Sequence, residues 1–196
     1  MLKRRLALVL LVAGMGSMLQ TAWAQSSGAA SAKPQAPLAA EKTPPGDIPD
    51  NQAFVEYRSP LGFSIKVPEG WARREQPNGV RFSDKYNGVQ VEVLSRVLAP
   101  TVASLKANEV AVLEKSPQAI RVASVTQLAL PAGAPIVVRY GANSDVNAVT
   151  NKAIRLDSAS YYFWKAGKLA VLTLSAPAGA DNVDHWQLMA KSFTWR

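Results

Sequence analysis

The chain offers few side chains that could carry out a reaction or hold a metal ion. Its only histidine, His185, is adjacent to Asp184 and four residues after Asp181, and it contains no cysteine. On a helix, Asp181 and His185 would lie on one face and could share a metal ion. In the alternative interpretation, Asp181 caps the helix, Asp184 completes a capping-box-like arrangement and His185 faces solvent. We favour this alternative, because two or three ligands on one exposed turn make a weak metal site.

Sequence motifs of the common enzyme classes are also missing. The chain has no Gly-rich phosphate-binding loop, no Gly-x-Ser-x-Gly nucleophile elbow and no cysteine-based motif. Hydrolytic triads need a histidine, and only His185 could supply one. We therefore expect a protein that is not an enzyme and that uses no cofactor.

The densest aromatic run comprises Tyr161, Tyr162, Phe163 and Trp164. In a strand, Tyr161 and Phe163 would point to one face of the sheet and the other two rings to the opposite face. Tyr161, Tyr162 and Trp164 are thus candidate binding residues that could stack on a ligand or a partner. The alternative, which we favour, is that helices cover both faces of the sheet and the rings pack in the core.

A polar segment, residues 143–147, has side-chain oxygens at alternate positions, as calcium-binding loops do. It reads Asn-Ser-Asp-Val-Asn, and it lacks the remaining ligands and the spaced glutamate of a hand-type site. An ordinary turn rich in Asn and Asp is therefore the favoured interpretation. A calcium carrier is kept as an alternative function.

The charge pattern argues against a nucleic-acid partner. The net charge is +8, and Lys3, Arg4 and Arg5 contribute three of these positive charges, which leaves +5 for the rest of the chain. Beyond them the basic residues are scattered, and only Arg73 and Arg74 are adjacent, whereas nucleic-acid binders cluster their cations on one element. Arg73 and Arg74 are candidates for a binding surface that attracts anionic lipid or an acidic protein face.

The N-terminal region has the features of a signal for export. Three cations precede an apolar run, and Ala22-Trp23-Ala24 then provides a cleavage site with small residues. We predict a signal peptide at residues 1–24, cleaved after Ala24, rather than an uncleaved anchor, because the run is short for a bilayer span. Residues 25–52 are rich in Ala, Ser and Pro and are predicted to be a disordered tether. The protein should then be periplasmic or secreted, with no membrane span after cleavage.

Residues 53–196 are predicted to form one α+β domain, a largely antiparallel sheet covered by helices. Alternating or apolar runs bounded by turn residues predict strands, and hairpins dominate the connections. Thr101 is expected to cap a helix over residues 101–116, and a second, short helix should follow Asp181. Trp71 and Trp186 are expected to fill the core. The expected strands span residues 55–58, 63–67, 71–75, 80–83, 89–93, 120–130, 136–142, 153–164 and 169–175.

Glu109 is an anomaly on the predicted long helix. It falls beside Val102 and Leu105, on the face that should cover the sheet. An unpaired buried carboxylate is costly, so we expect a partner on the sheet, with Arg121 or Arg139 favoured by their place in the sequence. In the alternative, the helix rotates and leaves the carboxylate of Glu109 at its rim, in water.

Several segments together resemble one known family. Residues 62–68, Gly-Phe-Ser-Ile-Lys-Val-Pro, are followed by Gly70 and Trp71, like the early Gly-Phe strand of the PsbP-like proteins that ends in Pro and Trp. The strand at Tyr86–Val93, the long helix, the strand pair around residues 165–168 and the closing Lys-Ser-Phe at 191–193 follow in the family's order. The resemblance covers residues 54–196. It implies the α/β/α sandwich that these proteins share with the eukaryotic Mog proteins, which act on the Ran GTPase.

What the resemblance implies about function is broad. The namesake is an extrinsic subunit of photosystem II at the lumenal membrane face, linked to calcium and chloride retention, and bacterial relatives are exported. This chain has no recognisable photosystem-docking element before the domain. We therefore expect a non-catalytic extracytoplasmic binding or assembly module whose partner is another envelope protein or a membrane-associated complex. The alternatives are a carrier of a small ligand or calcium ion and, in a photosynthetic host, a photosystem II-type subunit.

Overall fold

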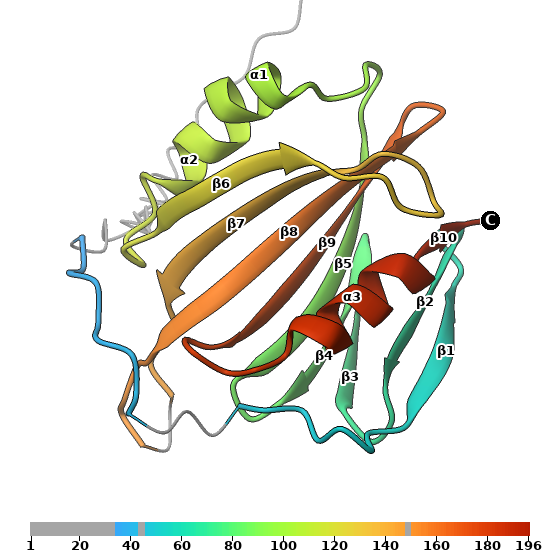
Figure 1. Cartoon of the computed structure of the whole chain (residues 1–196). Coiled ribbons are helices and arrows are strands. Elements are labelled where there is room, and N and C mark those ends of the chain that lie inside the picture. Colours follow the sequence, from blue (N-terminus) through green and yellow to red (C-terminus); the bar gives the residue numbers. More distant parts are fainter. Residues whose placement is uncertain (1–33, 43–45, 148–149) are drawn as a thin grey trace, which may run out of the picture. The chain divides into compact units, whose positions relative to one another are not determined.

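The computed structural model describes residues 34–42, 46–147 and 150–196 of the chain (Figure 1). The predicted signal peptide, residues 1–24, lies outside the described residues, as do residues 25–33 of the predicted tether. The described residues form two antiparallel sheets and two helical segments. The predicted α+β class with a largely antiparallel sheet is therefore confirmed.

The larger sheet has seven strands in the order β3-β4-β5-β9-β8-β7-β6, and the smaller sheet has the order β1-β2-β10. Hairpins join most neighbouring strands, as the alternating pattern predicted. The strands are β1 (Phe54–Ser59), β2 (Phe63–Pro68), β3 (Ala72–Gln76), β4 (Gly79–Asp84), β5 (Asn87–Ser95), β6 (Arg121–Gln127), β7 (Ile136–Asn143), β8 (Arg155–Lys165), β9 (Lys168–Pro177) and β10 (Thr194–Trp195).

Two short turns fix the register of the central strands. Lys165 pairs with Lys168 across the β8–β9 turn, where Ala166 and Gly167 both have positive φ, as two-residue hairpin turns require. In the β4–β5 turn, the residues between the two strands are Lys85 and Tyr86. Asn87 already pairs with Asp84, and Lys85 takes the positive φ.

The main core lies between the two sheets and helix α3 (Val183–Ser192), which crosses one face of the large sheet (Figure 1). Three fully buried rings meet there: Phe193 stacks on Phe163 at 4.3 Å and on Phe63 at 5.7 Å between ring centroids. These rings come from the end of α3, from β8 and from β2, so one aromatic stack joins both sheets. Trp71 and Trp186 pack against this core but are only partly buried, unlike the expectation.

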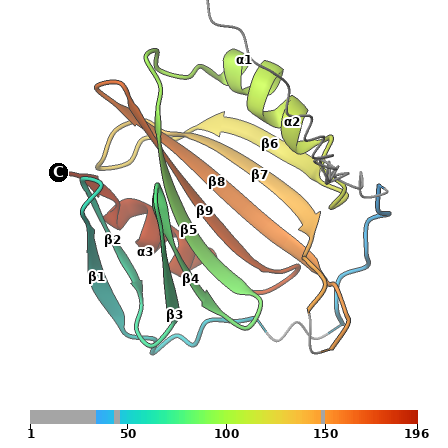
Figure 2. The same cartoon turned by 180° about the vertical axis from the view of Figure 1, so that it is seen from behind.

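The opposite face of the large sheet carries the long helix. It consists of α1 (Val102–Leu105), a π-helical turn (Lys106–Val110) and α2 (Ala111–Leu113), and Thr101 caps it through a hydrogen bond from Ser104 N–H. Leu105 and Val110 pack on the side chains of β7, β8 and β9. Figure 2 shows that the helix lies over the β6–β7 side and leaves β5, β4 and β3 without a helix on this face. The expectation that helices cover both faces is therefore only half met.

Part of the predicted tether belongs to the folded domain. Ile48 is 4% exposed and sits in the main core. The buried side chain of Asn182 accepts a hydrogen bond from Ile48 N at 2.7 Å and donates one to Gly46 O at 2.8 Å. Leu38 N donates to Asn143 Oδ1 at 3.1 Å, so residues 34–42 also contact the domain. Residues 46–48 therefore pack with the domain, although they precede its expected start at residue 53.

The start of α3 also departs from the expectation. Its N-cap residue is Asn182 rather than Asp181, and the Asn182 side chain is engaged by residues 46–48 instead of capping the helix. Asp181 is exposed, and its backbone N–H donates to Asp47 Oδ1 at 2.9 Å. The predicted capping arrangement of Asp181 and Asp184 is therefore absent from the described residues.

Candidate functional site

The uncovered part of the large sheet is the candidate functional site, and we call it the open face. Side chains alternate along each strand, so every second residue of the central strands points to this face. On the core face these strands carry Val, Leu, Ala and aromatic residues, whereas on the open face they carry mainly polar side chains. The open face is defined by Arg81, Gln90, Tyr140, Ser158, Ser160, Thr173 and Ser175.

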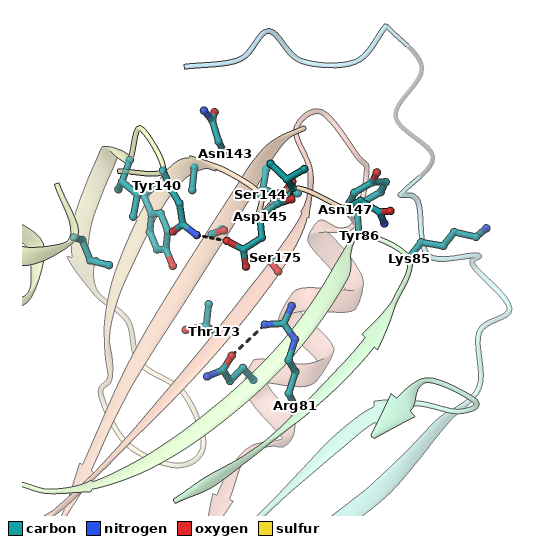
Figure 3. Close-up of a pocket in the computed structure, with 18 residues that line it drawn as sticks. Arg81, Lys85, Tyr86, Tyr140, Asn143, Ser144, Asp145, Asn147, Thr173 and Ser175 are labelled. Atoms are coloured by element: carbon teal, nitrogen blue, oxygen red, sulfur yellow. Dashed lines mark hydrogen bonds between the residues drawn. The ribbon is translucent and has the colours of Figure 1, made fainter. Parts of the chain in front are cut away.

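Two adjoining hollows lie along the open face. One has a volume of about 440 Å³, and Figure 3 shows Arg81, Tyr140, Thr173 and Ser175 from three strands around it. The other has a volume of about 620 Å³ and runs beside the long helix. Both hollows are lined by Leu113, Tyr140 and Thr173, so together they form one continuous groove across the sheet.

The floor of this groove is a row of hydroxyl groups. Ser160 Oγ and Thr173 Oγ1 are 2.9 Å apart and hydrogen-bonded, and Tyr140 Oη lies 3.4 Å from Ser160 Oγ. A hydroxyl can both donate and accept, so the row can satisfy either kind of polar group on a ligand. The signal was present in the sequence, because Ser158 and Ser160 alternate with core residues in one strand, as Thr173 and Ser175 do in the next.

One end of the groove has a surplus of positive charge, because Arg74, Arg81 and Lys85 lie there with one carboxylate, that of Asp145. Arg81 stands directly opposite Arg74 across the β3–β4 pair, and Lys85 lines the rim. Among the described residues neither arginine forms an ion pair, and Arg81 makes only a 3.4 Å hydrogen bond to Gln90 Oε1. Like charges that face each other across a strand pair are destabilising. An anionic group bound between them would relieve this repulsion.

The predicted pair Arg73 and Arg74 is split between the two faces. Arg73 points to the face opposite the open face. On that side its guanidinium lies 5.8 Å from the centre of the Tyr57 ring, and its Nε is 3.4 Å from Glu75 Oε1. Arg74 shares the register of Arg81 on the open-face side. Of this pair, only Arg74 belongs with the groove.

The helix end of the groove holds the ion pair of Glu109 with Arg96. Arg96 Nη1 donates to Glu109 Oε1, and each side chain is 25% exposed. Glu109 Oε2 is buried without a hydrogen-bond partner among the described residues. A paired Glu109 is confirmed, but the expected partners are wrong. Arg139 lies on the other face beside Tyr161, and Arg121 is exposed at the start of β6, whereas Arg96 follows β5 beside the helix.

The aromatic run does not form a stacking platform. Tyr161 is 4% exposed and belongs to the main core, while Tyr162 is 7% exposed and packs under the long helix. Trp164 is 37% exposed, and its Nε1 donates to Arg96 O at 2.8 Å. The core interpretation therefore holds for both tyrosines, and only Trp164 keeps a surface available for binding.

The candidate metal ligands are not brought together. Asp181 and Asp184 are exposed, and the ring of His185 stacks on Phe54 with 5.8 Å between centroids. In residues 34–42, 46–147 and 150–196, no group of three or more His, Asp or Glu side chains could hold a metal ion. In the polar loop, Asn143 is buried and binds Leu38 and Arg155, and Asp145 accepts from Gln118. The side-chain oxygens of Asn143 and Asp145 are therefore already engaged by partners within the protein.

Tyr162 should make stability sensitive to alkaline pH. Burial, with nearby Tyr140 and Glu109, raises the pKa of Tyr162 from 10.0 to about 12. The folded state keeps a proton on Tyr162 that the unfolded chain releases above pH 10.0. The contribution of protonated Tyr162 to stability is therefore complete below pH 10.0 and is lost as the pH rises toward 12. At about pH 11, deprotonation of the unfolded state should remove about 1 kcal/mol of stability.

Urea unfolding of the wild type and Tyr162→Phe at a series of pH values measures this effect. Tyr162→Phe should lack the part of the alkaline loss of stability that comes from Tyr162. The difference in free energy of unfolding between the two proteins should stay constant below about pH 9. Parallel stability curves up to about pH 11 would contradict the prediction.

None of the helices in the described part of the chain has the length and apolar content that a membrane crossing requires.

Comparisons with known proteins rest on structure. No protein-family model matches the chain, and no curated protein matches its sequence significantly. The solution structure of cyanobacterial PsbP (CyanoP) from Synechocystis sp. PCC 6803 matches with a TM-score of 0.56 and 13% identity, over 74% of this chain and 94% of that one.

Two crystal structures show weaker similarity. A protein from Bacteroides thetaiotaomicron matches with a TM-score of 0.49 and 11% identity, over 72% of this chain and 48% of that one. A Pseudomonas aeruginosa protein of unknown function matches with a TM-score of 0.47 and 11% identity, over 73% and 97%. At these identities the likeness concerns the fold. The chain therefore has a PsbP-like α+β fold, as its sequence resemblance predicted.

Proposed function

We propose that this chain is a non-catalytic binding module, exported to an extracytoplasmic compartment, that holds its partner on the open face. The observation that carries the proposal is the groove on a sheet face that the long helix leaves uncovered, with hydroxyl groups on its floor. A sheet face of this kind in a domain core would be apolar, as the opposite face is. The polar floor is compatible with solvent and with a polar partner.

The shape of the groove favours a partner protein over an enclosed small molecule. It runs across several strands and has a polar floor, whereas carriers usually enclose their ligand in an apolar pocket. Arg74, Arg81 and Lys85 at one end favour a partner segment that carries carboxylates. We therefore propose an acidic segment of another envelope protein as the bound partner.

A carrier of a small organic anion is the second candidate. The hollow at Arg81 has a volume of about 440 Å³, within the range of small-molecule sites. In this function the guanidinium of Arg81 would bind the anion, and the hydroxyls of Thr173 and Ser175 would orient its polar groups.

Neighbouring arginines on one strand provide a matched test. Arg74→Glu and Arg81→Glu should each weaken capture of the partner by about tenfold or more, because the acidic segment would meet a like charge. Arg73 is next to Arg74 on β3, but its side chain points to the other face of the sheet. Arg73→Glu should therefore leave capture of the partner unchanged. Photo-crosslinkers at Gln90 on the open face and at Arg139 on the opposite face, followed by purification from the envelope fraction, identify the partner.

The outcomes separate the candidates. Crosslinks from position 90, weakened by Arg81→Glu but not by Arg73→Glu, support the binding module. Equal losses of capture for Arg81→Glu and Arg73→Glu, or crosslinks from position 139 only, would overturn the binding module. If no protein is captured, calorimetry with citrate as a model small anion tests the carrier, and binding that Arg81→Glu abolishes would favour it.

A further inference from the structure

A second surface lies at one end of the large sheet, and we call it the apolar tip. It consists of three connecting segments: residues 96–101 between β5 and α1, residues 128–135 between β6 and β7, and residues 164–168 at the β8–β9 turn. Both views show the three segments side by side (Figures 1 and 2). Arg96 N donates to Gly167 O at 2.8 Å, and Ala99, Ala132 and Trp164 line one small hollow.

The apolar tip exposes large side chains that nothing in the described chain covers. Val97 is 87% exposed and Leu98 is 78% exposed, side by side in one loop. Trp164 lies next to them, held by its bond to Arg96 O. Tryptophan prefers the boundary between water and hydrocarbon, because its ring is apolar and its N–H is polar. An aliphatic pair beside a tryptophan is the kind of group that inserts into a lipid interface.

The charges around the apolar tip are all positive except for the partner of Arg96. The three segments contain Arg96, Lys165 and Lys168 and no Asp or Glu. Glu109 neutralises Arg96, which leaves the two exposed lysines. The connecting segments near the other end of the sheet carry both signs of charge, with Lys85 and Lys152 beside five aspartates, Asp47, Asp50, Asp84, Asp145 and Asp181. An anionic surface would therefore attract the apolar tip.

We propose that the apolar tip inserts into the headgroup region of an anionic lipid bilayer. Val97 and Leu98 would enter the acyl boundary, Trp164 would lie at headgroup depth, and Lys165 and Lys168 would contact lipid phosphates. Lipid fits better than a protein because the apolar side chains stand on connecting loops beside the two lysines of the β8–β9 turn, and protein interfaces are depleted in lysine. The combination supplies the two signals, apolar and basic, that stable peripheral binding needs. This inference is independent of the function proposed for the groove.

The absence of cysteine allows a site-specific test on the full chain. Ala99→Cys, labelled with an environment-sensitive nitrobenzoxadiazole dye, places a reporter beside Val97 and Leu98 without altering them. Asp84→Cys, at the last residue of β4 at the other end of the sheet, is the matched control. Each labelled protein is mixed with phosphatidylcholine vesicles or with vesicles of phosphatidylcholine and phosphatidylglycerol in a ratio of about three to one.

Insertion predicts a blue shift and a rise in fluorescence at position 99 with the anionic vesicles only, and no change at position 84. Lys165→Gln with Lys168→Gln should weaken the response by about tenfold, as should a few hundred millimolar salt. Val97→Ser with Leu98→Ser should abolish it. No change at position 99, an equal response at both positions, or a response that survives the serine substitutions would overturn the proposal. Because each dye reports only its own surroundings, vesicle binding elsewhere on the chain cannot imitate the expected pattern.

Discussion

Replacing Phe193 by alanine is expected to lower the free energy of unfolding by about 3–5 kcal/mol. Phe193 is fully buried between Phe63 of β2 and Phe163 of β8, and the edge of Trp195 contacts it with 5.7 Å between ring centroids. Removing the ring leaves a cavity between two sheets whose backbones are fixed by hydrogen bonds, so the site can collapse only partly. Phe193 thus joins the small sheet to the large one through direct ring contacts.

Urea denaturation with a structural probe for each sheet measures this change. Leu188→Ala on the exposed side of α3 is the control, and it should cost less than about 1 kcal/mol. A loss for Phe193→Ala that is no larger than the loss for Leu188→Ala would show that the aromatic stack does not hold the sheets together.

Asn182→Ala is expected to lower the free energy of unfolding by about 2–4 kcal/mol. The substitution removes two buried hydrogen bonds, to Ile48 N and Gly46 O, and leaves both backbone groups without their partner. Release of residues 46–48 from α3 would then expose Ile48, which adds the loss of an apolar side chain from the core.

Proteolysis distinguishes local release from global unfolding. Asn182→Ala should make the chain near residue 48 a cleavage site under conditions in which the wild type resists, and its melting temperature should fall by several degrees. Asn78→Ala, at an exposed turn between β3 and β4, is the control and should change neither measurement. Equal protection of residue 48 in the wild type and the Asn182 variant would contradict this assignment.

Local patterns in the sequence predicted the parts of the fold that depend on neighbours in the chain. Alternation along residues 155–165 and the turn at Ala166-Gly167 specify the β8–β9 hairpin. Thr101 caps the long helix as predicted, because the capping bond joins residues three apart. The alternating serines of β8 also marked the polar face in the sequence, although they could not show that the helix would leave that face uncovered.

The errors concern contacts between residues distant in the sequence. Ile48 is one aliphatic residue in a polar segment, and only its bond to Asn182, 134 positions away, makes it part of the core. The partner of Glu109 depended on which loop approaches the helix. Arg96 is 13 positions away on the loop that leads into the helix, whereas alternation along β7 turns Arg139 to the opposite face. Neither fact follows from the helical period.

The two outer strands of the large sheet determine how copies of this protein meet one another. β3 is short and carries Arg73, Arg74 and Glu75, all exposed, and β6 has an irregular register between Val122 and Ser124. Each of these features hinders a strand from another molecule from extending the sheet, the first by charge and the second by bending the edge. A half-covered sheet would otherwise be at risk of edge-to-edge aggregation. Both edges of the large sheet therefore oppose its growth into a polymer.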